Sequence, residues 1–225
     1  MSTAATGNEG AEGPLRLRGS AAVPVMAGLA TVLAVASLPA SGADPRPPIE
    51  QRVQACVACH SQDGNSIVPD NPKLAGLHGD YVVKQLSDFK RGVRKSPIMN
   101  AVMASVAEED FKEIAAYFSA QIRTRDQATD ASLLPHGRTI YSDGIVAAAV
   151  PACANCHNED GSGTAKYPRL AAQHQAYVIR QLLAFKTGER SNDVRGVMST
   201  LAKRTNEQEI RAVAEYIATL PGTEP

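Results

Sequence analysis

All four cysteines of the chain lie in two copies of one five-residue motif, at residues 56–60 and 153–157. The motif residues are Cys56, Cys59 and His60 in the first copy and Cys153, Cys156 and His157 in the second. Two thiols spaced in this way can form thioether bonds to the two vinyl groups of one protoporphyrin, and the adjacent histidine then reaches the iron. A redox-active thiol pair does not need the histidine, and a zinc site needs four convergent ligands. The motif therefore predicts two covalently bound haem c groups.

An iron bound by one histidine still has one open axial position. Met99 and Met198 occupy equivalent places in the two copies, eight residues before Ala107 and Asn206, respectively. We therefore expect their thioethers to complete the coordination, so that the metal ligands are His60, Met99, His157 and Met198. Thioether ligation raises the reduction potential of the iron and closes the site, which favours electron transfer over catalysis.

Three other side chains compete for this role. Met103 has no methionine counterpart in the second copy, where Ala202 corresponds to it, and it is expected to fill the core. His78 and His174 are repeated and remain the alternative ligands, although a histidine at a helix start is the more ordinary interpretation.

The second half of the chain repeats the first with small changes of register. Cys56 recurs 97 residues later as Cys153, whereas residues 72–94 recur with an offset of 96 and Met99 recurs with an offset of 99. The second copy has therefore gained three residues before its methionine. A repeat of this length is a domain and not a solenoid unit.

Apolar residues in each copy recur at helical spacing, with Gly92 and Gly188 ending one predicted helix in each copy. Asn206 with Glu209 predicts a capping box for the last helix, whereas Ala107 offers no side-chain cap. No alternating strand pattern of useful length occurs, so we predict an all-α fold. The predicted domains are 44–124 and 137–225, with a linker over 125–136 and a helix that begins at Gly137.

The amino-terminal segment is predicted to be a signal peptide. Arg16 and Arg18 precede an uncharged stretch over residues 21–40, and small residues at 41–43 suit a signal peptidase. We expect cleavage before Asp44 and a periplasmic protein, with an uncleaved membrane anchor as the alternative.

Charge and composition restrict the partners. Lys plus Arg and Asp plus Glu both number 23, so the formal net charge is zero and no net positive field can hold a nucleic acid. The hydrophobic fraction of 44% is that of a globular protein. Four basic residues near one helix end are expected to form a solvated face, with docking to an acidic redox partner or contact with haem propionates as the alternatives: Lys90, Arg91, Arg94 and Lys95.

The combined motifs resemble a known family over about residues 50–220. Each Cys-x-x-Cys-His motif is followed by Pro-Lys-Leu-Ala or Pro-Arg-Leu-Ala, then by Tyr-x-x-x-Gln-Leu and a methionine before the last helix. This combination resembles the di-haem cytochrome c4 group of class I cytochromes c. The resemblance implies two tandem class I cytochrome c domains, each wrapped around one haem, with approximate two-fold symmetry. The sequence departs from the family pattern at Ile49, where a glycine is usual at a close helix crossing.

The resemblance also implies a function. Members of the group carry electrons in the periplasm from a quinol-oxidising cytochrome bc complex toward a terminal oxidase, so the expected partners are redox proteins and membrane association occurs through them. An electron carrier of this kind is not an enzyme. The alternatives are the cytochrome subunit of a flavocytochrome-type dehydrogenase, for example one that oxidises sulfide, and a di-haem peroxidase, which needs one open iron.

Overall fold

The computed structural model describes residues 46–222. Within this range all regular secondary structure is helical, apart from one isolated β-bridge between Ile145 and Val150. The predicted all-α fold is confirmed. The predicted signal peptide, residues 1–43, lies outside the described residues. None of the described helices is long and apolar enough to cross a membrane.

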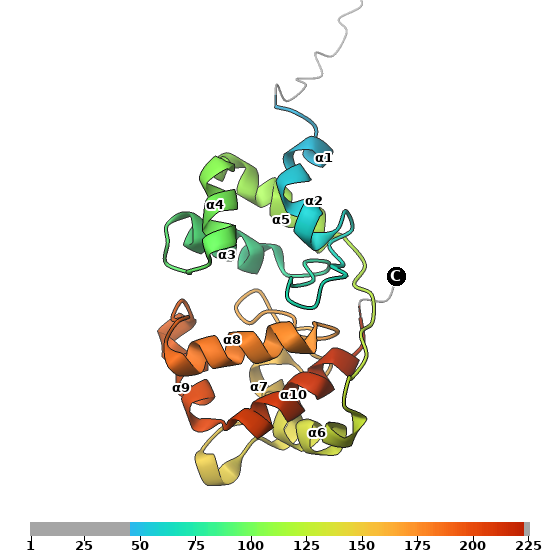
Figure 1. Cartoon of the computed structure of the whole chain (residues 1–225), viewed down its shortest axis with the longest axis vertical. Helices are drawn as coiled ribbons and strands as arrows, with labels where there is room; N and C mark the ends of the chain where they lie inside the picture. Colours follow the sequence, from blue (N-terminus) through green and yellow to red (C-terminus); the bar gives the residue numbers. More distant parts are fainter. Residues whose placement is uncertain (1–45, 223–225) are drawn as a thin grey trace, which may run out of the picture. The chain divides into compact units, whose positions relative to one another are not determined.

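Within the described residues, the first half contains five α-helices, which are labelled in Figure 1, and one short 3-10 helix. In chain order they are α1 (Ile49–Arg52), α2 (Gln54–His60), α3 (Gly79–Lys90), α4 (Pro97–Ser105), η1 (Glu108–Asp110) and α5 (Phe111–Ser119). Helices α3 and α5 bury the apolar stripes that their spacing predicts, and the core of this half forms between them.

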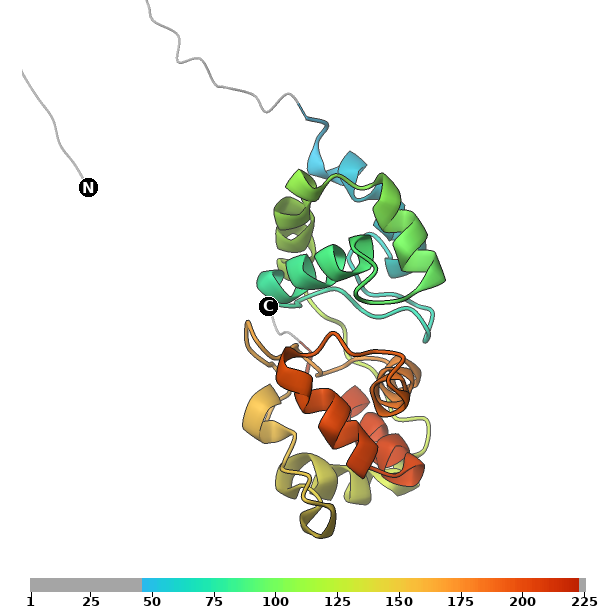
Figure 2. The ribbon, with the colours of Figure 1, turned by 90° about the vertical axis from the view of Figure 1, so that its left-hand side faces the viewer.

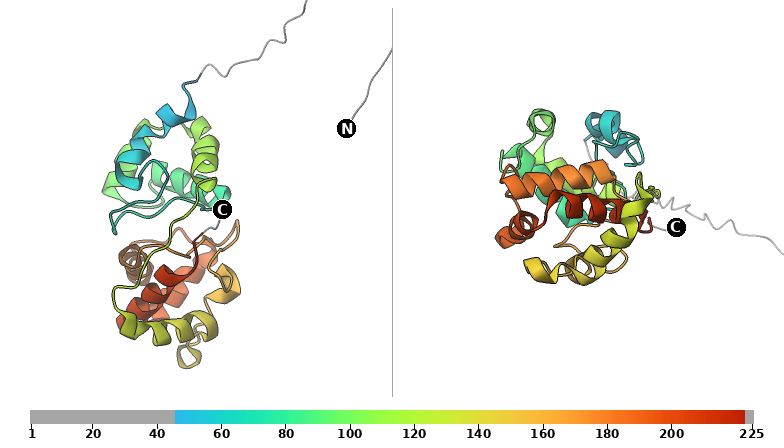
Figure 3. Two further views of the ribbon diagram at one scale, coloured as in Figure 1. Left: turned by 90° about the vertical axis from the view of Figure 1, so that its right-hand side faces the viewer. Right: turned by 60° about the horizontal axis from the view of Figure 1, so that its bottom comes forward.

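The second half repeats the order α2 to α5 as α7 to α10. Its elements are η2 (Ala131–Leu133), α6 (Leu134–Asp143), η3 (Val146–Ala148), α7 (Ala154–His157), α8 (Gln175–Thr187), η4 (Val194–Gly196), α9 (Val197–Arg204) and α10 (Glu207–Thr219). A second core forms where α10 packs against α6 and α8, as Figures 2 and 3 show. Both halves belong to one unit of the chain, which begins at Asp44.

The helix ends follow the predicted local chemistry. Gly92 and Gly188 follow α3 and α8 with φ angles of +71° and +82°, the left-handed region that glycine enters without a steric penalty. The predicted capping box of Asn206 and Glu209 is present at α10. Ala107 forms no side-chain cap, and a 3-10 turn precedes α5.

The opening helix of the second half begins earlier than predicted. Helix α6 begins at Leu134 and not at Gly137, and η2 precedes it, so η2 and the first turn of α6 lie within the predicted linker 125–136. Pro135 lies in the first turn of α6, where a missing N–H costs no helical hydrogen bond, so the helix can begin before Gly137.

Gly137 allows α6 and α10 to cross closely. A Cβ atom at this position would lie 2.0 Å from the Ala212 carbonyl oxygen, which is far inside van der Waals contact. The opening helix of the first half is the short α1, which begins at Ile49. The Ile49 side chain packs against the core.

Candidate haem sites

The first motif lies on α2. Cys56 is half-buried and Cys59 is exposed, and neither forms a disulfide. His60 is the last residue of α2, and its side chain is buried at 6% exposure.

The second motif lies at α7. Cys153 stands at the N-cap of this helix, and Cys156 lies one turn later; both are half-buried, and neither forms a disulfide. His157 is the last residue of α7 and is buried at 5% exposure. The two motifs thus present the same groups in the same local setting.

The two motif histidines are held in the form that binds a metal. The Nδ1 atom of His60 lies 2.8 Å from the Pro72 carbonyl oxygen, and that of His157 lies 2.9 Å from the Pro168 carbonyl oxygen. A carbonyl can accept but not donate, so Nδ1 carries the proton and the lone pair is on Nε2. Burial lowers the pKa of both rings, against the opposing effect of the carbonyl bonds, and so favours the neutral form. A hydrogen bond from the other ring nitrogen to a carbonyl oxygen orients an imidazole that binds a metal.

The structure separates the three methionines of the described chain. Met99 on α4 and Met198 on α9 are half-buried at equivalent places. Met103 is buried at 1% exposure within the first core, which confirms its predicted packing role. The Ser96 side chain accepts a hydrogen bond from the Met99 N–H, at 3.3 Å, and fixes the start of α4.

The alternative ligands His78 and His174 are engaged elsewhere. The Nε2 atom of His78 lies 3.1 Å from the Ser162 carbonyl oxygen, and that of His174 lies 2.8 Å from the Ser66 carbonyl oxygen. Each histidine therefore contacts the opposite half. The Nδ1 atom of His174 also lies 2.6 Å from a carboxylate oxygen of Asp126. These contacts favour the methionines as ligands.

The predicted basic face is wrong for two of its four residues. Arg94 is buried at 7% exposure, and Lys90 donates to the carbonyl oxygens of Met103 and Val106, at 3.0 and 2.6 Å, where α4 ends. A cation at that place satisfies carbonyls that have no helical partner. Arg91 and Lys95 are exposed and remain available to solvent or a partner.

A cluster of polar side chains that the sequence analysis did not assemble joins the two halves. This seam cluster consists of Tyr81, Gln85, Arg94, Tyr177, Gln181 and Arg190. Arg94 donates to the Tyr177 hydroxyl at 2.9 Å and to the Gln181 carbonyl oxygen at 2.7 Å.

Arg190 makes the equivalent bonds in the other direction, to Tyr81 and Gln85, both at 3.3 Å. All six residues recur at the offset of 96, so the repetition of these polar residues was the one sequence signal of the cluster, although it did not indicate that they meet. The cluster connects α3 and α8, the helices that follow the two haem motifs.

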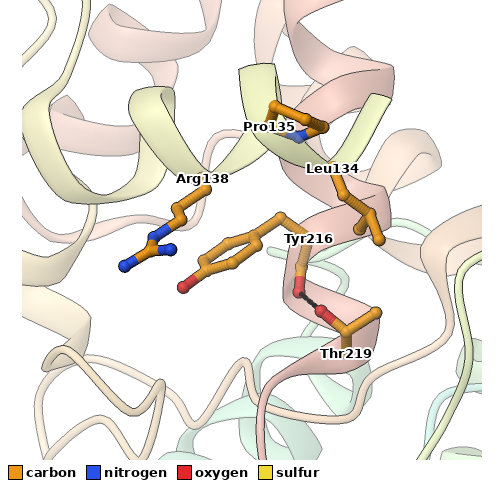
Figure 4. Close-up of a pocket in the computed structure, with 5 residues that line it drawn as sticks. All are labelled: Leu134, Pro135, Arg138, Tyr216 and Thr219. Carbon is orange, nitrogen blue, oxygen red and sulfur yellow. Dashed lines mark hydrogen bonds between the residues drawn. The ribbon is translucent and has the colours of Figure 1, made fainter. Parts of the chain in front are cut away.

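A shallow groove between α6 and α10 is separate from these sites. Figure 4 shows the residues that line it: Leu134, Pro135, Arg138, Tyr216 and Thr219. None of the predicted haem ligands borders this groove, so it has no part in the sites described above.

Comparison with known proteins agrees with this arrangement. The cytochrome c family model matches residues 50–121 and 136–221. The chain is 41% identical to a cytochrome c4 of Thiocapsa roseopersicina, over 72% of this chain and 85% of that protein. It is 34% identical to a thiosulfate dehydrogenase electron acceptor of Stutzerimonas stutzeri, over 73% of this chain and 78% of that one.

A solved structure is also similar. The reduced recombinant cytochrome c4 from Pseudomonas stutzeri superposes with a TM-score of 0.74 at 36% identity, covering 76% of this chain and 96% of that chain. The two ranges of the family match each contain one Cys-x-x-Cys-His motif. The chain therefore carries two covalently bound haem c groups in two tandem all-α domains.

Proposed function

Because the chain belongs to the cytochrome c family, and within it to the di-haem electron-transfer proteins of the cytochrome c4 group, we propose that it carries single electrons between redox proteins of the periplasm. The proposed thioether positions are Cys56, Cys59, Cys153 and Cys156. The proposed axial ligands are His60 and Met99 for one iron and His157 and Met198 for the other.

The observation that carries this proposal is the state of the two motif histidines. Each is buried and hydrogen-bonded at Nδ1 to a backbone carbonyl, so each offers the Nε2 lone pair in a fixed orientation. The haem supplies a one-electron Fe(III)/Fe(II) couple. The protein contributes fixed ligands and a dry surrounding, so that little rearrangement accompanies a change of oxidation state.

We propose further that residues 1–43 direct export and are removed before Asp44, leaving domains over 44–124 and 137–225. The mass of the protein recovered from the periplasm tests this statement. Retention of the first 43 residues in a membrane fraction would support the anchor instead.

The route of the electrons has two candidates. One runs from a quinol-oxidising cytochrome bc complex to a terminal oxidase. The other, favoured by the similarity to a thiosulfate dehydrogenase electron acceptor, begins at a dehydrogenase that oxidises a sulfur compound; a flavocytochrome is another such dehydrogenase. Stopped-flow reduction of the oxidised protein by each purified donor distinguishes them, since the physiological donor reduces it with the larger second-order rate constant.

The ligand assignment is tested by the near-infrared sulfur-to-iron charge-transfer band of the oxidised protein. The parent protein is expected to show this band, and Met99→Ala and Met198→Ala are each expected to lose about half of its intensity, since one of two irons loses its thioether. Met103→Leu is the matched control and should keep the full band. A parent protein without the band, or a ligand variant that keeps it in full, would contradict the assignment at that iron and reopen the peroxidase alternative.

A further inference from the structure

The loops that lead to the two proposed methionine ligands are anchored differently. In the first half, residues 91–96 are closed by a side chain of the same half. The Asn100 side chain accepts from the Ser96 N–H at 2.7 Å and donates to the Arg94 carbonyl oxygen at 3.1 Å. The residue at the equivalent place in the second half is Ser199, and its hydroxyl donates to the Asp193 carboxylate instead.

The longer loop of the second half is closed by the first half. Asn192 lies in the lengthened segment between Arg190 and Met198 and is buried at 7% exposure. Its amide donates to the Gln85 carbonyl oxygen at 3.0 Å and to an Asp88 carboxylate oxygen at 2.7 Å, both on α3. The ammonium group of Lys84 donates to the Asn192 carbonyl oxygen at 2.7 Å. Three side chains within about one turn of α3 thus hold this one residue.

The anchored residue is directly followed by the one that fixes the methionine turn. The Asp193 carboxylate accepts from the Ser199 N–H at 3.0 Å and from the Ser199 hydroxyl at 2.8 Å. Burial acts to raise the pKa of Asp193, but the bonds from Ser199 and the N–H of Met198 lower it overall. A displacement of Asn192 would therefore be passed through one peptide unit to the group that holds Met198.

Arg94 and Arg190 link the two loops to opposite helices in the same way, so they do not distinguish the halves. The hydrogen bond between Asn192 and Asp88 does distinguish them. Position 184, which corresponds to Asp88 in the second half, is an alanine and offers no acceptor to the first loop.

We propose that Asn192 is a positioning residue through which α3 of the first half holds the Met198 thioether on the second iron. This inference rests on the proposed function, because it takes Met198 as a ligand. The first iron has no equivalent dependence, since Asn100 closes its loop from within the same half.

Imidazole binding to the oxidised protein tests the proposal, because imidazole occupies an iron only when the thioether has left it. The near-infrared band reports the thioether that remains, and the Met99→Ala and Met198→Ala proteins assign its two halves. Asn192→Ala and Asp88→Ala both remove the hydrogen bond between Asn192 and Asp88. Each is expected to increase the imidazole affinity of the second haem at least about fivefold, the effect that the loss of one such bond has on a local equilibrium. The first haem should be unchanged.

Asn100→Ala is the matched control and should increase the imidazole affinity of the first haem alone. An unchanged affinity at the second haem in both Asn192→Ala and Asp88→Ala would overturn the inference, as would an equal change at both haems. If Met198→Ala removes half of the band and these two variants still have the parent affinity, the ligand assignment stands and this inference alone fails. If Met198→Ala keeps the whole band, both fail.

Discussion

Two helices of different length open the two halves, the four-residue α1 and the ten-residue α6. Helix α6 meets α10 by close backbone approach at Gly137, whereas α1 is tied to η1 and α5 by charged side chains. Arg46 and Arg52 both form ion pairs with Asp110 and Glu113. The opening helix of a haem-binding domain can thus be held by close backbone packing or by ion pairs. The two kinds of contact should be lost under different conditions.

The largest effect is expected from a methyl group at the close crossing. Gly137→Ala places a Cβ atom against the Ala212 carbonyl and should destabilise the second half by about 3 kcal/mol or more, since neither backbone can yield without moving its helix. Guanidinium unfolding followed at the near-infrared band measures this loss of stability. Half of the band should disappear at a lower denaturant concentration in Gly137→Ala than in the parent protein.

Gly79→Ala is the matched control for that substitution. The nearest group to its new Cβ would be the Ser119 hydroxyl at 3.5 Å, an ordinary contact, so the unfolding midpoint should change little. Helix propensity favours alanine over glycine at both positions, so a similar loss of stability in both variants would mean that the crossing at Gly137 does not set the cost.

A smaller effect is expected at the starts of α5 and α10. Asn206→Ala removes the side-chain cap of α10 and should cost the second half about 1 kcal/mol. Ala107→Asn supplies the first half with the missing cap, at a backbone geometry of φ −72° and ψ 141° that suits an N-cap, and should stabilise it by up to about 1 kcal/mol. Denaturant midpoints of both variants check the pair; a loss of stability in Ala107→Asn would show that η1 already satisfies these amides.

The smallest effect concerns pH. Hydrogen bonds from Arg52 and Arg46 lower the pKa of Glu113 below its ordinary value of 4.5. A carboxyl with a lowered pKa stabilises the fold above its unfolded-state pKa and loses that contribution as the pH falls through its folded-state pKa. The thermal midpoint of the first half should therefore fall below pH 4.5, more steeply than in Glu113→Gln. Equal slopes in the two proteins would contradict the interpretation that ion pairs to Glu113 hold α1 in place.

Local patterns were enough to predict the helices, the motifs and the duplicated order of elements. The capping box at Asn206 and the stop at Gly92 depend on residues a few positions apart, so their geometry follows from the sequence nearby. The family match agrees with the two haem c groups that the motifs predict.

The error at Arg94 has its physical origin in contacts between distant residues. Arg94 was expected on a solvated face because a cluster of basic residues is usually solvated, but Tyr177 and Gln181 of the other half bury it. The offset of 96 between these residues marked them as repeated without indicating that they meet. The three gained residues predicted a different loop, and the structure adds that its anchor is α3.

The seam cluster has the geometry of an isologous contact, in which one surface meets a copy of itself. In a homodimer, any substitution in such a surface appears twice, so both sides must tolerate it together. Here the two copies lie in one chain, and each position is encoded separately, so one side can change while the other stays the same. The pair of Asn192 and Asp88 is a change of that kind, because the residue that corresponds to Asp88 in the second half is Ala184.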